Sequence, residues 1–221
     1  MRQRWVTTML MLVQGTPLSP GKLAGIVLML LLPGMLSCGE SRADGPDGTS
    51  GPINSIVEAA RNQVGVTVTY DPAYVALSYP GGDLPRAKGV CSDVVIRALR
   101  EGKKMDLQKL VHEDMKSNFA KYPKIWGLRR TDRNIDHRRV PNLRTYLTRK
   151  GCAVPVTKKA GDYHPGDLVT CTVPPNLPHI MIVSDRRSSR GIPLVIHNIG
   201  RGTREENLLF TYPLTGHYRV Q

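Results

Sequence analysis

Aromatic residues are scarce in this chain of 221 residues, which has two Trp and two Phe. Proteins that bind single-stranded nucleic acid stack bases on aromatic side chains, so this composition argues against a nucleic-acid partner. Cysteine is also scarce, at four residues. Neither a paired-cysteine spacing nor an H-E-x-x-H motif, the usual marks of zinc sites, occurs in the sequence. We therefore expect neither a metal nor another cofactor.

The chain also lacks an apolar run of the roughly 20 residues that a membrane-spanning helix needs. Its best candidate, "LAGIVLMLLLPGML" at 23–36, is shorter and contains Pro33. The only charges up to this run are Arg2, Arg4 and Lys22, and none is acidic. Positive charge followed by a short apolar region is typical of a secretory signal peptide, which we predict over residues 1–37.

The sequence "MLSCGE" follows the apolar run directly, and its small residue before Cys38 resembles the processing box of bacterial lipoproteins. This predicts lipidation at Cys38 and a membrane anchor through it, with ordinary cleavage near "SRADG" as the alternative. The expected location is the cell envelope, in the periplasm or on the outer surface, or else outside the cell. Residues 38–52, rich in Gly, Ser, Pro and Asp, predict a flexible tether, and 53–221 one domain.

Acidic residues are outnumbered, 18 against 31 Lys and Arg, for a net charge of +13. Loss of the three positive charges before Cys38 leaves about +10. A positive field of this size favours anionic partners. Together with the export signal, it predicts peptidoglycan or another anionic polymer of the envelope as the partner.

Apolar residues recur at helical spacing in the first half of the domain and at strand-like spacing in the second. The helices are expected at 53–65, at 91 to about 100, at 105–123 with Asp106 as cap, and at 141–151 with Asn142 as cap and Gly151 as terminator. Strands are expected at 167–173, 179–185, 193–199 and 216–221. Helices followed by an antiparallel sheet predict an α+β fold in which the two halves pack on each other.

A long loop rich in Pro and Gly, residues 66–89, precedes Cys91 at the start of a helix. A thiol there faces unpaired backbone N–H groups and the positive end of the helix dipole. Both favour the thiolate, and Arg86 and Lys88 add to the effect. The pattern predicts a nucleophile with a lowered pKa, and the alternative is a buried structural cysteine or half of a disulfide.

Two histidines can act as the base that a nucleophilic thiol needs. His179 follows a Pro at the start of one expected strand, and His197 ends the next strand before a Gly turn. Antiparallel neighbours would bring these two positions close together. Such a pair can supply a general base and its orienting partner.

The order of these features resembles the NlpC-type branch of papain-fold cysteine peptidases. In that branch a Tyr lies twelve residues before the catalytic Cys and is followed by a Gly pair, as Tyr79 and Gly81–Gly82 are here. The finer pattern "YPGGD…GVCSDVV…NIDHRRVPNL…PHIMIVSD…IHNIG" is similar to an uncharacterised family of secreted bacterial proteins, a domain of unknown function, placed beside that branch.

The resemblance implies a papain-like fold and a Cys-His-His triad that cleaves a peptide or amide bond, most commonly in peptidoglycan stem peptides. Cys91 would attack the carbonyl, His179 would transfer the proton, and His197 would orient His179. Tyr79 and Ser92 would line the oxyanion or substrate side. The sequence departs from the branch at Asp93, where "VCSD" replaces the usual "DCSG" and sets an acid beside the thiol.

Other interpretations stay open. The protein could be a catalytically silent papain-like module that binds wall polymer or a protein partner, or a thiol acyltransferase. A zinc site from the triad residues is disfavoured by the missing motifs. Cys171 either pairs with Cys152 or is part of the core. We expect Asp167 to form a turn and the remaining histidines to be surface or loop-anchoring residues: His112, His137, His164 and His217.

Overall fold

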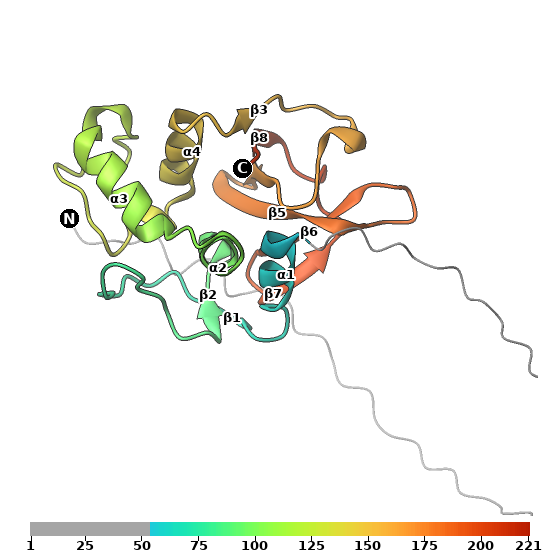
Figure 1. The fold of residues 1–221 in the computed structure, drawn as a ribbon, viewed down its shortest axis with the longest axis horizontal. Helices are drawn as coiled ribbons and strands as arrows, with labels where there is room; N and C mark the ends of the chain where they lie inside the picture. Colours follow the sequence, from blue (N-terminus) through green and yellow to red (C-terminus); the bar gives the residue numbers. More distant parts are fainter. Residues whose placement is uncertain (1–53) are drawn as a thin grey trace, which may run out of the picture. The chain divides into compact units, whose positions relative to one another are not determined.

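Helices precede the main sheet in the computed structural model, which describes residues 54–221 (Figure 1). The predicted signal peptide and tether, with Cys38, lie outside these residues. Within them the helices are α1 (Ser55–Arg61), α2 (Cys91–Lys103), α3 (Leu107–Ser117) and α4 (Val140–Arg149). None is long and apolar enough to cross a membrane.

The main sheet is antiparallel, with the strand order β3-β8-β4-β5-β6-β7. The α+β class is therefore confirmed at this level. The strands are β3 (Ala153–Val154), β4 (Leu168–Val173), β5 (Leu177–Arg187), β6 (Pro193–Asn198), β7 (Thr203–Glu206) and β8 (Leu214–Tyr218).

Successive side chains of a strand point to opposite faces of the sheet. Both faces of the central strands are covered here, each by its own buried cluster. Helices α1 and α2 pack against β5 and β6. Helical residues such as Val94 and Leu99 are fully buried in one cluster with Ile180 and Ile182 of the sheet. The other face buries a second cluster: Tyr163, Val169, Cys171, Met181, Val183, Val195 and Leu209.

Cys171 is thus a core residue of this second face. Cys91, Cys152 and Cys171 are all free thiols. The alternative of a Cys152–Cys171 disulfide is therefore wrong for this structure.

Two of the three predicted helix-end residues have the predicted role, and the third does not. Asp106 caps α3, and its carboxylate accepts a hydrogen bond from the Gln108 N–H as expected. Gly151 follows α4 with a φ of 73°, which suits glycine as a terminator. Asn142, however, is not the cap of α4: the helix begins at Val140 with Pro141 in its first turn. The Asn142 amide is buried inside the helix and donates to the Asp136 carbonyl.

Two helix ends and two strands also differ from the prediction. Helix α1 ends at Arg61 rather than near Gly65, and the regular part of α3 ends at Ser117. The short strands β3 and β7 were not predicted. Two and four residues carry too little alternation to stand out as strands.

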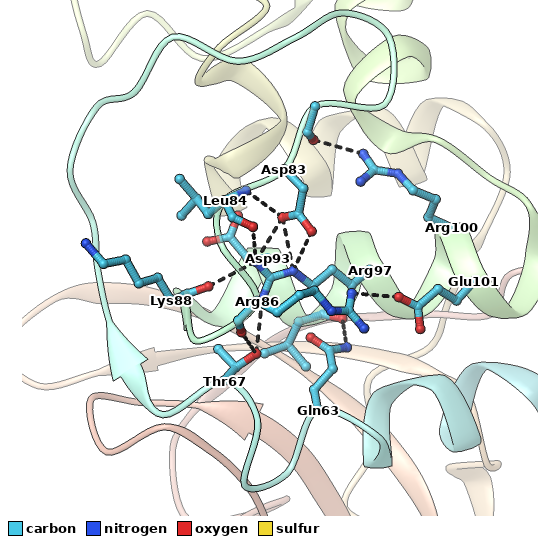
Figure 2. A network of polar contacts seen from close by, with 12 residues as sticks. Gln63, Thr67, Asp83, Leu84, Arg86, Lys88, Asp93, Arg97, Arg100 and Glu101 are labelled. Carbon is cyan, nitrogen blue, oxygen red and sulfur yellow. Dashed lines mark hydrogen bonds and ion pairs between the residues drawn. The ribbon is translucent and has the colours of Figure 1, made fainter.

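The long loop before Cys91 contains β1 (Thr69–Tyr70) and β2 (Lys88–Gly89), which form a small parallel pair. Arg97 on α2 holds this loop (Figure 2). Its side chain is 1% exposed, and its guanidinium forms an ion pair with Asp83. It also donates to the Thr67 hydroxyl and to the carbonyls of Leu84 and Lys88. The loop is therefore fixed to the helix that begins with Cys91.

Candidate active site

Cys91 is the first residue of α2 and lies against the strand that carries His179. Toward His179, the pairing between β5 and β6 stops at Ile182 and Ile196. Beyond that pair, the Asn198 amide donates to the Gly89 carbonyl just before α2. The Cys91 sulfur faces the backbone N–H of Ile180 on β5 and the N–H groups of Cys91 and Ser92. The start of the helix and the end of the ladder thus meet at the thiol.

The thiol is 4% exposed, and burial raises its pKa to about 11. The three backbone N–H groups favour the thiolate, and the Asp93 carboxylate opposes it. The prediction of a lowered pKa is therefore wrong for this conformation. Desolvation penalises the charged form more than the helix end stabilises it.

His179 and His197 do come together, as their expected strand positions predicted. Nε2 of His179 lies 2.9 Å from Nδ1 of His197, and the two ring planes are nearly perpendicular at 80°. Both rings are buried, at 4% and 1% exposure. Burial, helped by the neighbouring His197, lowers the pKa of His179 to about 3. His179 is therefore neutral near pH 7 and able to accept a proton.

The contact between the two rings also decides which nitrogen can serve Cys91. Nε2 of His179 is occupied by His197, so Nδ1 is left for a thiol. Among the hydrogen bonds of residues 54–221, none joins the Cys91 sulfur to either ring. At rest the thiol and both imidazoles are neutral, so they form no ion pair.

A pocket of about 290 Å³ opens beside Cys91. Its walls come mainly from the two loops that precede α2 and α4, with Tyr70 from the first and Trp126 and Arg139 from the second. The Arg139 guanidinium lies over the Trp126 ring at 4.2 Å from its centre. Sequence reasoning missed these three residues. The sequence contains only a weak indication of them, namely that aromatic or basic residues in long loops often bind ligands.

Tyr79 and the Ser92 hydroxyl are not where the resemblance implied. Tyr79 packs on His112 of α3, with 5.3 Å between ring centres, and does not line this pocket. Tyr70, which is 40% exposed, is the tyrosine that lines the pocket beside the thiol. The Ser92 hydroxyl is buried and donates to the Arg138 carbonyl at 2.8 Å. Only the Ser92 backbone N–H faces the sulfur.

A second pocket, of about 470 Å³, shares Pro141 with the first. It is lined by Lys121, Arg144 and Arg149 and by no carboxylate. Arg149 is neutralised by Asp114 at 2.8 Å. Arg144 donates through Nη2 to a backbone carbonyl, and its buried Nε has no partner. This cationic pocket therefore presents charge suited to an anion.

Two of the remaining histidines are buried, contrary to the surface reading. His137 is 2% exposed, and burial lowers its pKa to about 4. His217 lies 2.8 Å from the Asp167 carboxylate and stacks on Tyr163. His164 is exposed and His112 is half-buried.

Asp167 forms the expected turn, because its carboxylate accepts from the His164 N–H at 2.8 Å. It also binds Arg219, at 2.7 Å. Within the described part of the chain, no cluster of three or more His, Cys, Asp or Glu side chains is arranged to hold a metal ion.

Comparison with known proteins places this architecture in a family. The family described as domain of unknown function (DUF1287) matches residues 57–220. The chain belongs to this family. It is also 57% identical over 165 residues to "Uncharacterized protein YijF" of Escherichia coli (strain K12), a match that covers 75% of this chain and 80% of that protein. The predicted membership of a family of unknown function is confirmed.

Proposed function

We propose that the protein is a thiol-dependent hydrolase of papain-like, NlpC-type architecture that cleaves a peptide or amide bond. The observation that carries this proposal is a thiol at a helix start that faces the strand of a buried histidine pair. Cys91 begins a helix that packs on the sheet, and its sulfur faces the backbone N–H of Ile180, the residue that follows His179 in the chain. His179 in turn contacts His197 at 2.9 Å.

In the proposed reaction, the substrate carbonyl enters the pocket beside Cys91. The sulfur forms a bond to the carbonyl carbon while its proton passes to Nδ1 of His179. The N–H groups of Cys91 and Ser92 stabilise the oxyanion. His179 then gives the proton to the leaving amine, the C–N bond breaks, and a thioester remains. Water attacks the thioester with His179 as base, which releases the acid and restores the thiol.

The neutral state of both partners shapes this mechanism. Because the pKa of Cys91 is raised to about 11, proton transfer must accompany the attack on the carbonyl rather than precede it. His179, whose pKa is lowered to about 3 by burial, is unprotonated near pH 7 and can accept the proton, although so low a pKa makes it a weak base. General base catalysis of this kind is typically worth about 10²–10⁴-fold in rate.

The substrate we propose is the stem peptide of peptidoglycan, reached in the cell envelope through the signal peptide and a lipid anchor at Cys38. The cationic pocket supports an anionic polymer as partner, since it adjoins the Cys91 pocket at Pro141. A polymer chain bound there would pass the thiol.

Digestion of isolated peptidoglycan by the purified protein tests this proposal. Chromatography of the soluble products should show released peptide fragments, and Cys91→Ala should abolish them. Cys152→Ala is the matched control, because Cys152 is also a free thiol but lies outside the Cys91 pocket. Equal release by Cys91→Ala and the unaltered protein would refute the mechanism.

One observation favours a second candidate, a catalytically silent module that binds the same polymer. The thiol is buried, with a pKa of about 11, and no hydrogen bond links it to His179 within residues 54–221. This candidate predicts saturable binding to peptidoglycan that survives Cys91→Ala, without release of fragments.

A further inference from the structure

Glu206 on β7 continues the line of side chains that runs through the two histidines. Its partner in the ladder is Val195 on β6, so its side chain lies on the same face of the sheet as His197, two residues further along. Oε2 of Glu206 is 3.4 Å from Nε2 of His197. That separation is within ion-pair distance but too long for a full hydrogen bond, and His197 Nε2 has no other partner.

The contacts constrain where the ring protons reside. A carboxylate can only accept, so Glu206 favours a proton on Nε2 of His197. A neutral ring then has an unprotonated Nδ1, which accepts from Nε2–H of His179. His179 is left with an unprotonated Nδ1. This is the nitrogen that the proposed reaction requires as base.

We propose that Glu206 is a positioning residue that fixes the tautomers of His197 and His179. The effect on tautomers stands on its own, and the consequence for catalysis rests on the proposed function. The sequence offered no signal for this role, because Glu206 is one of two adjacent glutamates in a strand that was not predicted.

The charges near Glu206 fit this role. Its other oxygen, Oε1, is 3.7 Å from the Arg204 guanidinium, and its side chain is 27% exposed. Arg204 thus lies at Oε1 and leaves Oε2 for His197. On the other side, burial lowers the pKa of His197 and Glu206 raises it. The carboxylate is thus the group that holds a proton on this ring.

Nitrogen-15 NMR of the histidine side chains tests the inference without any substrate. Both rings should show protonated Nε2 and unprotonated Nδ1 near pH 7. In Glu206→Gln the amide can also donate to Nε2, so a second tautomer should appear in His197 and, through it, in His179. Glu58→Gln on α1 is the control, since that side chain is exposed and remote in sequence. Unchanged tautomers of both rings in Glu206→Gln would overturn the inference.

The kinetics of the Glu206→Gln variant provide a second test. Glu206→Gln should lower kcat by about tenfold or more, part of the 10²–10⁴-fold that general base catalysis supplies, with little change in KM. If tautomers shift but the unaltered protein releases no fragments, the positioning role stands and the hydrolase proposal fails. If fragments are released and the tautomers do not shift, the hydrolase stands and the role of Glu206 is refuted.

Discussion

Arg138 and Asp93 form a buried ion pair with two contacts, two residues from Cys91. Arg138 Nε lies 2.9 Å from one carboxylate oxygen of Asp93, and Nη2 lies 3.0 Å from the other. The two side chains are 2% and 5% exposed. Asp93 also accepts from the Val90 N–H, so it closes the first turn of α2. Asp93, the unusual acid near the thiol, is therefore held in place by Arg138 and by the first turn of α2.

Asp93→Ala should be strongly destabilising. It leaves the Arg138 guanidinium buried without its counter-charge, a change that typically costs about 3–5 kcal/mol. Urea unfolding gives the loss in free energy. Glu101→Gln is the control, because the Arg86–Glu101 pair is more than 40% exposed on both sides and should contribute less than about 1 kcal/mol. A similar small loss for both variants would contradict the assigned role.

Arg97→Met should release the loop at 66–89 from α2. The variant leaves Asp83 and the carbonyls of Leu84 and Lys88 without their donor. We expect faster cleavage within the loop in limited proteolysis and a loss of stability of several kcal/mol, as for other broken buried pairs, about 3–5 kcal/mol. Arg86→Met in the same loop is the matched control, and equal cleavage of the two variants would show that Arg97 does not hold the loop.

The sequence predicts those parts of the site that follow from local pattern. The start of α2 at Cys91 and the strand positions of His179 and His197 are readable because periodicity fixes which residues share an edge. The pocket cannot be predicted from local pattern, because Tyr70 and Trp126 line it only once two irregular loops have folded. The pKa of the thiol was predicted with the wrong sign, since a helix end is visible in sequence and the depth of burial is not.

Alkylation of Cys91 by iodoacetamide should be slow at neutral pH and should accelerate with pH. With a pKa of about 11, the thiolate fraction grows about tenfold for each pH unit below that value, and only the thiolate reacts. Mass spectrometry of the peptide that contains Cys91 measures the rate. The half-buried Cys152 in the same digest reports general access. Rapid modification of Cys91 at pH 7, independent of pH, would show that the thiol is ionised.

Stability should fall as the pH drops below about 6.5. The pKa of His179 is about 3 and that of His137 about 4 in the folded protein, below the ordinary value of 6.5, because both are buried. The unfolded chain therefore binds more protons between these values, and each histidine can cost up to about 1.4 kcal/mol per pH unit. The stabilising effect is present above pH 6.5 and is lost toward pH 3–4.

Urea unfolding at several pH values measures this slope. His137→Gln should reduce it, whereas His164→Gln, at an exposed site, should leave it unchanged. Protonation of Asp167 should lower the stability further at more acidic pH. Burial raises its pKa, but bonds from Arg219 and His217 outweigh that effect and lower it to about 2, so its contribution disappears between about pH 4 and pH 2. A slope that is the same in His137→Gln would contradict the burial argument.

Removal of charge from the cationic pocket should weaken binding to anionic wall polymer. The double variant Lys121→Gln and Arg144→Gln takes away the two cations that no carboxylate neutralises in this pocket, while Arg149 stays paired with Asp114. Co-sedimentation with peptidoglycan should show several-fold weaker binding and a smaller effect of added salt, because exposed charges are screened at high ionic strength.

The matched control for this pocket is the double variant Lys158→Gln and Lys159→Gln, which removes the same charge from exposed sites outside it. If net charge alone attracts the polymer, the two double variants should lose binding equally. A larger loss for the Lys121 and Arg144 variant means that the polymer is held at the pocket next to Pro141. Binding there would place the chain of the substrate beside Cys91 before any bond is cut.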